Sequence, residues 1–351
     1  MADLHTAAEA GYCSIAELHV SEGTMGLRTR LTEKLQIEHP ILSAPMGNVA
    51  GGKLAGAVSE AGGLGLIGGG YGDEAWLTRE FAAAGNRRVG CGFITWSLAR
   101  NPGLLDLALA HAPAALMLSF GDPGPFARKI LDAGSVLICQ VQSTEHARAA
   151  LDAGAAIIVA QGTEAGGHGA QRSTLPLVPA IADLVARRVP DALVVAAGGI
   201  ADGRGLAAAL MLGAEGVLVG TRFYASAEAL GHEAAKARIV AAAGDETLRT
   251  TIFDTIRGYD WPAEFTGRAL ANRFASRWHG REQDLAAALQ AEQEAYRDAV
   301  AAGDFTTGCI FAGEAVDLIA DLPGAGDIVR RMVAEAESAL QAGYRRIAPV
   351  A

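Results

Sequence analysis

Short apolar runs rich in β-branched residues alternate with alanine-rich stretches up to about residue 220, and this alternation constrains the fold more than any other feature of the sequence. Eight of these runs are predicted to be strands. They are apolar throughout, which is typical of parallel strands that are buried on both faces. The predicted strands are Ile41–Pro45, Leu64–Ile67, Val89–Ile94, Ala115–Phe120, Val136–Val141, Ala156–Ala160, Leu193–Ala197 and Gly216–Val219.

Stretches with helical composition follow these strands. Eight strand-then-helix units are typical of a closed (β/α)8 TIM barrel, whereas an open doubly wound sheet more often has five or six strands. A chain of 351 residues, half of them hydrophobic, is long enough for one such barrel with an insertion. The predicted barrel helices are Lys53–Glu60, Ala75–Ala84, Gly103–His111, Pro125–Ala133, Thr144–Leu151, Leu177–Arg187, Gly203–Leu212 and residues 327–342.

The alternation stops after Val219. Residues 225–310 are rich in Ala, Glu and Arg and contain no run that predicts a strand, so a helical insertion or lid is expected, with helices near Glu233–Ala243 and Asp284–Ala302. An insertion at this point would lie over the carboxyl ends of the barrel strands, where barrel loops form active sites. The predicted division is an N-terminal extension at 1–25, a barrel formed by 26–224 and 311–351, and the insertion at 225–310.

Charge and composition exclude several classes of partner. The formal net charge is −10 and no basic run stands out, so nucleic acid is not expected to bind. No apolar run reaches the ~18 residues of a membrane span and no export signal is visible, so we expect a cytoplasmic protein that does not enter a membrane. The cysteines Cys13, Cys91, Cys139 and Cys309 lack CxxC spacing, which predicts reduced thiols and no metal site. The sequence leaves the oligomeric state open, including a homodimer.

Glycine turns end the last two predicted strands. Gly198 and Gly199 follow the seventh strand, and Gly220 and Thr221 follow the eighth. Glycine lets backbone N–H groups approach phosphate oxygens, and the loops after the last two strands are the usual phosphate site of a barrel. Either pair alone would fit an ordinary turn. Together, on neighbouring loops of one rim, they predict a phosphate site.

A second glycine pattern, GxGxxG at residues 63–68, does not predict a dinucleotide site. A dinucleotide fingerprint follows a strand and opens a helix. Here the pattern follows a predicted helix and contains the second strand itself. Gly68 and Gly70 are expected in the loop after that strand, on the rim where the active site is predicted.

Four strings of residues together resemble the nitronate monooxygenase family, formerly called 2-nitropropane dioxygenases, which also contains flavin-type enoyl-ACP reductases and NADH:quinone reductases. The Glu-Ala-Gly-Gly-His part of the second string is quite specific to this superfamily. The resemblance extends over about residues 26–225 and weakens towards the end of the chain. The strings are Ala44-Pro45-Met46, Gly162-Thr163-Glu164-Ala165-Gly166-Gly167-His168, Ala197-Gly198-Gly199-Ile200 with Asp202-Gly203-Arg204, and Gly213-Ala214 leading to Gly220-Thr221-Arg222-Phe223.

The resemblance implies an oxidoreductase with FMN across the mouth of the barrel. The end of the first strand would approach the flavin ring through its backbone, the glycines after the sixth strand would flank the ring, and the glycine turns would hold the phosphate. Some family members have a lysine near the flavin where this chain has Gln140, a departure that concerns redox tuning and not binding. The implied cofactor-binding residues are Pro45, Met46, Gly47, Gln140, Gln161, Gly166, Gly167, Gly198, Gly199, Gly220 and Thr221.

His168 is the predicted catalytic residue. A histidine above the ring could accept a proton from an acidic carbon or hydrogen-bond an anionic substrate near neutral pH, and the alternative is that it only satisfies a loop carbonyl. Glu164 is interpreted as an acceptor that orders the loop rather than as a catalytic acid. Gln140 and Gln142 alternate along one strand and should point the same way, and a satisfied polar residue inside the barrel is the alternative role for Gln140.

Other residues at strand ends, most of them aromatic, have two interpretations. Phe93, Thr95 and Trp96 after the third strand either wall a substrate pocket or pack in the core, and Tyr224 with the insertion is expected to close the far side.

Three reactions fit the sequence to different degrees. The first is oxidation of an alkyl nitronate by O2 to a carbonyl compound and nitrite. The second is reduction of a quinone or an enoyl thioester with electrons from NAD(P)H, which needs no separate dinucleotide domain if nicotinamide stacks on the flavin in turn. The third is a non-redox barrel that binds a phosphorylated ligand. The glycine turns alone permit the third, but the Ala44-Pro45-Met46 and Glu-Ala-Gly-Gly-His strings argue against it.

Overall fold

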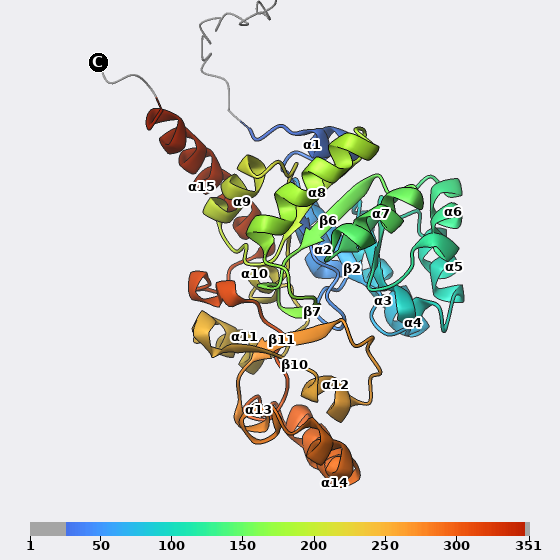
Figure 1. Cartoon of the computed structure of the whole chain (residues 1–351), viewed down its shortest axis with the longest axis vertical. Coiled ribbons are helices and arrows are strands. Elements are labelled where there is room, and N and C mark those ends of the chain that lie inside the picture. The colour runs from blue at the N-terminus through green and yellow to red at the C-terminus, as the bar shows by residue number, and fades with distance from the viewer. Residues whose placement is uncertain (1–25, 348–351) are drawn as a thin grey trace, which may run out of the picture.

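The computed structural model describes residues 26–347, so the expected extension at 1–25, with Cys13, and the last four residues lie outside the described residues. Eight parallel strands close into a barrel surrounded by helices, which confirms the predicted (β/α)8 TIM barrel (Figure 1). The order around the barrel is β1-β2-β3-β4-β5-β6-β8-β9. These strands are β1 Ile41–Ser43, β2 Leu64–Gly68, β3 Gly90–Ile94, β4 Ala115–Ser119, β5 Val136–Val141, β6 Ile157–Gln161, β8 Leu193–Ala197 and β9 Val217–Val219.

Every predicted barrel helix is present. One short helix precedes the barrel, two single-turn helices follow strands β3 and β9, and the last helix, α15, packs closely against α9 and α2. The helices of the barrel are α1 Arg30–Leu35, α2 Gly52–Glu60, α3 Glu74–Ala84, α4 Thr95–Leu98, α5 Gly103–Ala110, α6 Gly124–Asp132, α7 Thr144–Asp152, α8 Thr174–Arg188, α9 Gly203–Met211, α10 Thr221–Tyr224 and α15 Ala325–Arg345.

The strand ends differ from the prediction by one or two residues, for local reasons. Pro45 has no N–H to donate to a neighbouring strand, and β1 ends two residues before it. Phe120 adopts a left-handed backbone with φ of 63°, so β4 ends at Ser119. Both departures lie at the carboxyl end of the barrel.

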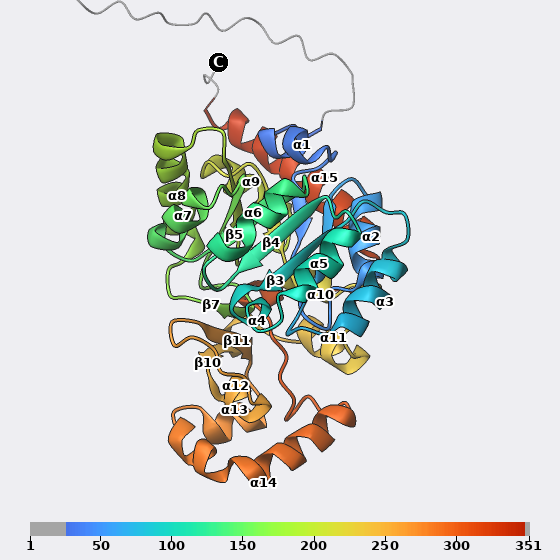
Figure 2. The same ribbon diagram turned by 90° about the vertical axis from the view of Figure 1, so that its right-hand side faces the viewer.

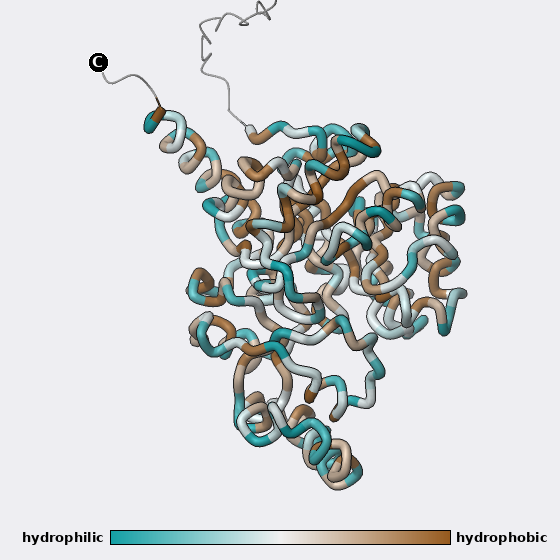
Figure 3. Tube along the Cα trace, viewed as in Figure 1, coloured by the Kyte–Doolittle hydropathy of each residue, from teal (hydrophilic) through white to brown (hydrophobic). Residues whose placement is uncertain are grey.

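Alternate residues of each strand face two different cores. In β5, Ile138 packs inside the barrel, whereas Leu137 and Cys139 pack outwards against the helices. Because both faces are buried, each strand is mostly apolar, with its few polar residues towards the carboxyl end, as in β4 and β6. Hydrophobic segments accordingly run through the barrel in Figure 3, and the outermost turns of the molecule are more polar.

The segment between β9 and α15 does not consist of helices alone, so the prediction of a strandless insertion was wrong. It contains two strands as well as helices, and Figure 2 shows it at the end of the molecule opposite α1. Its elements are α11 Glu233–Val240, η1 Gly244–Glu246, β10 Thr247–Thr250, α12 Ile252–Arg257, β11 Thr266–Leu270, α13 Arg273–Trp278, α14 Glu282–Ala301 and η2 Glu314–Leu318.

The two strands of this segment extend a strand of the barrel loops. β10 pairs with β11, and β11 pairs with β7 (Gly167–Gly169), a three-residue strand in the loop after β6. The pairing is antiparallel and places Gly267 opposite His168. Both strands are short and carry polar residues, and β7, the other partner of β11, lies far away in the chain, so a search for local apolar runs does not find them. The insertion is thereby fastened to the loop that carries the predicted catalytic residue.

None of the helices between residues 26 and 347 has the length and apolar character required to cross a bilayer.

Candidate active site

A cavity of about 790 Å³ lies between the carboxyl ends of the barrel strands and the insertion. Its volume is within the usual range for cofactor and substrate sites. Both parts of the chain line it, from Ala44 on the barrel side to Phe311 on the insertion side. The structure brings every predicted site residue to this one cavity: Pro45, Met46, Gly47, Gln140, Gln161, Gly166, Gly167, His168, Gly198, Gly199, Gly220 and Thr221.

The two glycine turns present unused backbone donors to the cavity. Gly198 and Gly199 have φ values of 103° and 71°, a region that other residues rarely adopt. Within residues 26–347, no hydrogen bond is made by the backbone N–H of Gly198, Gly199, Gly220 or Thr221. A Cβ at position 198 would lie 2.9 Å from Oγ1 of Thr174, so the turn has no room for a side chain. Four donors on adjacent loops can hold the oxygens of a phosphate.

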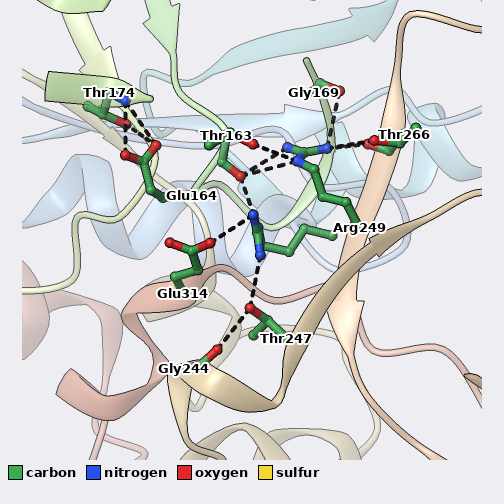
Figure 4. A network of polar contacts seen from close by, with 10 residues as sticks. Thr163, Glu164, Gly169, Thr174, Gly244, Thr247, Arg249, Thr266 and Glu314 are labelled. Atoms are coloured by element: carbon green, nitrogen blue, oxygen red, sulfur yellow. Dashed lines mark hydrogen bonds and ion pairs between the residues drawn. The ribbon is translucent and has the colours of Figure 1, made fainter. Parts of the chain in front are cut away.

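Glu164 orders the loop between these turns and the cavity, as predicted. Its carboxylate accepts hydrogen bonds from the backbone N–H of Thr174 at 2.9 and 3.0 Å and from the Thr174 hydroxyl at 2.8 Å (Figure 4). Its own carbonyl accepts a hydrogen bond from the N–H of Glu314. Glu164 therefore ties the loop after β6 to the start of α8 and to η2.

Three glutamines support the backbone of His168. Nε2 of Gln140 and Nε2 of Gln142 both donate to Oε1 of Gln161, at 3.1 and 2.8 Å, which confirms that the two side chains of β5 point the same way. Nε2 of Gln161 donates in turn to the carbonyl of His168 at 3.0 Å. Gln140 and Gln161 also line the cavity, whereas Gln142 is buried behind them.

The His168 ring is held by a carboxylate and not by a loop carbonyl. Nε2 lies 2.8 Å from Oδ2 of Asp254, and both side chains are buried. The indole of Trp261 stacks on the imidazole, with ring centroids 3.4 Å apart. Within the described part of the chain no residue hydrogen-bonds to Nδ1. This atom is accessible from the cavity.

Burial lowers the pKa of His168, and the charges of Arg257 and Arg249 lower it further, against the opposing effect of Asp254. The imidazole is therefore neutral at neutral pH. With Nε2–H donating to the Asp254 carboxylate, the lone pair of the neutral ring is on Nδ1. The site thus contains a base whose tautomer is fixed by a buried acid.

The insertion contributes a group of side chains that the sequence reasoning missed. Asp254 and Arg257 lie on α12, and Tyr259 and Trp261 follow it. Tyr71, from the loop after β2, stacks on Tyr259 with ring centroids 3.8 Å apart, and its hydroxyl accepts a hydrogen bond of 3.2 Å from Nε1 of Trp261. Burial raises the pKa of Tyr71 to about 12, so the hydroxyl stays protonated. In the sequence, a cluster of aromatic residues in an otherwise alanine-rich segment could have indicated this group of side chains.

The residues at the end of β3 and just after it divide between the two interpretations. Phe93 lines the cavity, and so does Tyr224 on the barrel side. Thr95 is buried in the core instead. Trp96 does not line the cavity but lies behind Trp261, and the two rings meet edge-on with their centroids 5.3 Å apart.

Two arginines of the insertion fasten it to the loop after β6. Nε of Arg268 donates to the carbonyl of Thr163 at 2.9 Å, and its NH2 group forms an ion pair of 2.8 Å with Glu314. Arg249 donates to the same carbonyl and also to that of Gly169 (Figure 4). Burial, together with the charge of Arg268, lowers the pKa of Arg249 to about 10, still well above neutral pH. Both arginines therefore have complete sets of partners and serve to position the loop.

No group of three or more His, Cys, Asp or Glu side chains is placed to bind a metal ion within residues 26–347.

Solved structures and curated proteins resemble the chain over most of its length. FabK from Thermotoga maritima superposes with a TM-score of 0.79 at 31% identity and covers 91% of this chain and 99% of that one. A nitroalkane oxidase from Streptomyces ansochromogenes gives a TM-score of 0.73 at 27% identity and covers 90% of this chain and 99% of that one. A (3aS,4S,5R,7aS)-5-hydroxy-7a-methyl-1-oxo-octahydro-1H-indene-4-carboxyl-CoA dehydrogenase of Mycobacterium tuberculosis is 29% identical over 90% of this chain and 98% of its own.

The family is shown by two further matches. A nitronate monooxygenase of Neurospora crassa is 34% identical over 86% of this chain and 90% of its own length. The sequence model of the family described as nitronate monooxygenase matches residues 28–85 and 98–335, which include both glycine turns, His168, Asp254 and the insertion. Members of this family are oxidoreductases and are generally flavin-dependent. The chain therefore belongs to the nitronate monooxygenase family and is an oxidoreductase.

Proposed function

We propose that the chain is an FMN-dependent nitronate monooxygenase, which oxidises alkyl nitronates with O2 to a carbonyl compound and nitrite. The observation that carries the proposal is a neutral histidine, oriented by a buried aspartate, in the same cavity as four free backbone donors. A base and a phosphate cradle in one cavity are the two protein parts that such a reaction requires. The insertion at 225–310 is part of this proposal as the cover of the cavity.

The residues present fit FMN. Backbone donors at Gly198, Gly199, Gly220 and Thr221 would hold the phosphate. Residues of the first-strand loop and the glycines after β6 line the cavity beside them, as do Gln140 and Gln161, and would hold the ring: Pro45, Met46, Gly47, Gly166 and Gly167. Bound FMN supplies electron transfer from the substrate to O2.

His168 would handle the proton. A neutral nitroalkane must lose its α-proton to become a nitronate, and Nδ1 of His168 is the free basic atom in the cavity. The imidazolium formed in this step would be stabilised by the carboxylate of Asp254 at 2.8 Å. With a substrate supplied as the nitronate, no α-proton remains to be removed and the proton step would be unnecessary.

Anaerobic reduction of the purified protein tests this proposal. The protein should be yellow, with absorbance near ~450 nm from the bound flavin. Under anaerobic conditions propyl nitronate should bleach this absorbance, whereas NADH and NADPH should not. Bleaching by NAD(P)H but not by the nitronate would refute the proposal, and a colourless protein that does not bind added FMN would refute any flavin chemistry.

A specific observation favours a second candidate, a flavin reductase that takes electrons from NAD(P)H and passes them to a quinone or an enoyl thioester. The cavity extends from the barrel rim to α14, where Gln293, Arg297 and Val300 line it, so it is long enough to admit a substrate with an extended tail. The likeness to FabK and to a dehydrogenase of a carboxyl-CoA compound points in the same direction. Bleaching by NAD(P)H followed by reoxidation with a quinone or an enoyl thioester would select this candidate.

A further inference from the structure

Arg257 is a cation in the cavity without an anionic partner. It is the last residue of α12, its side chain is half-buried, and it lines the cavity together with His168. Within the described residues, its guanidinium makes no ion pair and no hydrogen bond, and none of its nitrogens is sealed off from the cavity. The nearby arginines of the insertion, Arg249 and Arg268, are by contrast fully engaged. A partly buried cation gains from a ligand that supplies the counter-charge.

Aromatic rings hold the guanidinium in place. Cζ of Arg257 lies 4.7 Å from the ring centre of Tyr259, 5.4 Å from that of Phe311 and 5.9 Å from that of Tyr71. Such contacts stabilise a cation through the faces of the rings and do not use its N–H groups. Because guanidinium N–H donors lie in the plane of the group as a rigid fork, they remain available to a planar oxyanion.

The position of Arg257 ties it to the reacting end of the cavity. Asp254, which holds Nε2 of His168, lies one turn earlier on the same helix. The charges that act on His168 from the elements packed around it are Asp254 and Arg257 on α12 and Arg249 on β10. Of these three groups, Asp254 is bound to the histidine and Arg249 to backbone carbonyls. Arg257 is the one of the three that is left for a substrate; Arg297 on α14 also lines the cavity, but it is exposed and is not among the charges that act on His168.

We propose that Arg257 is the anion-binding residue of the substrate site and that it grips the two oxygens of a nitronate, or of another small planar oxyanion, beside His168. This inference rests on the proposed function, which supplies a substrate of that class. The guanidinium fork matches two oxygens on one central atom, as it does for a carboxylate. A nitronate held in this way would lie in the cavity that His168 also lines.

Binding of nitrate to the holoenzyme tests the inference without turnover. Nitrate is a planar oxyanion with no proton to lose, and its binding can be followed through changes in the flavin absorbance or in tryptophan fluorescence. The variant Arg257→Met should bind nitrate about 10- to 100-fold more weakly, the usual scale for loss of a charged hydrogen-bonding partner. Arg277 offers a matched control, because it also lies over an aromatic ring of the insertion but pairs with Glu292 outside the cavity. Arg277→Met should bind nitrate within about twofold of the wild type.

A second variant and a pH profile guard against a merely structural effect. Should Arg257→Met not fold, Arg257→Gln, which keeps a polar amide but loses the charge, should still weaken nitrate binding by at least about tenfold. Loss of the cation should also raise the pKa of His168, so the acidic limb of the activity profile should move to higher pH. Nitrate affinity that is unchanged in a folded Arg257 variant, or an unmoved acidic limb, would overturn the inference.

The outcomes separate this inference from the proposed function. Suppose that propyl nitronate does not bleach the wild-type flavin but that nitrate binding is lost in Arg257→Met. The anion site then stands and nitronate oxidation fails. If propyl nitronate does bleach the flavin and nitrate binds equally well to wild type and variant, the assignment of Arg257 is wrong and the proposed function stands.

Discussion

The two sides of the cavity are built in different ways. The barrel rim presents backbone donors at Gly198, Gly199, Gly220 and Thr221, and the space there admits no side chain at position 198. The insertion presents side chains instead, with an acid, a cation and stacked aromatic rings. One side is thus suited to a ligand common to a whole family, and the other to a particular substrate. Binding at the barrel rim depends on the shape of the cavity and on backbone groups, whereas binding on the insertion side depends on which side chains are present.

The largest expected effect tests the residue where the two sides meet. We expect His168→Asn to keep FMN but to lose at least ~10²-fold in turnover, the usual scale for removal of an acid–base group. Flavin content and kcat with a nitroalkane should be measured on the same preparation. His146 provides the control, because it lies beside Glu264 and outside the cavity, so His146→Asn should retain activity. Wild-type-like turnover of His168→Asn would refute a catalytic role.

A smaller loss is expected from Asp254→Asn, which alters the insertion side alone. The change removes the carboxylate that fixes the His168 tautomer and stabilises its cation, so kcat should fall by about tenfold or more. Asp254 raises the pKa of His168, so its loss should lower that pKa and move the acidic limb of the pH profile to lower pH. This direction is opposite to the one expected for Arg257→Met.

The control for this prediction is Asp260→Asn. Asp260 is exposed and lies in the segment between Tyr259 and Trp261, so the substitution removes the same charge at a site away from the cavity lining. If the acidic limb moves equally in both variants, the overall negative charge of the insertion determines the pH dependence of activity, and the contact between Asp254 and His168 does not.

The rim is tested by Gly198→Ala. A Cβ at this position would meet Oγ1 of Thr174 at 2.9 Å and the carbonyl of Gly162 at 3.0 Å, so the turn must shift and its donors must move. We expect FMN affinity to fall about tenfold, together with a cost of about 1–3 kcal/mol in the free energy of unfolding from the positive φ. Dissociation constants for FMN measured on apoprotein would show this.

Gly134→Ala separates strain from loss of the cradle. Gly134 also has a positive φ, 76°, but nothing lies within 4 Å of its missing Cβ. This variant should lose similar stability while keeping its FMN affinity. Equal loss of affinity in the two variants would show that the rim depends on overall stability rather than on close approach of the backbone.

The same division explains what the sequence could reveal. The eight strands were predictable because burial on both faces leaves unbroken apolar runs, and the glycine turns because a backbone site requires glycine at strand ends. Glu164 was interpretable as a loop-ordering acceptor, since the donors to its carboxylate lie ten residues away in the chain, at Thr174. In each case the structural cause lies within a short stretch of chain.

The insertion was predicted poorly because the interactions that form it join residues that are far apart in the chain. β10 and β11 are short, polar strands that exist through pairing with each other and with β7, about a hundred residues away in the chain. Asp254 lies 86 residues away from His168 in the chain and reaches it only in the folded insertion. No composition or period marks such a residue. Its identification required the tertiary structure.

The smallest expected effect probes whether the insertion side also works through its hydroxyl groups. Tyr71→Phe removes the acceptor for Nε1 of Trp261 but keeps the ring that stacks on Tyr259 at 3.8 Å. Trp261 is half-buried, so its freed N–H can reach water, and the free energy of unfolding should fall by only about 1 kcal/mol. Because the pKa of Tyr71 is raised to about 12, its hydroxyl is no base, and turnover should change by less than about threefold. The exposed Tyr344 supplies the control, as Tyr344→Phe should change neither quantity. A loss in kcat as large as that of His168→Asn would make Tyr71 a proton donor, and the insertion would then contribute chemistry as well as substrate recognition.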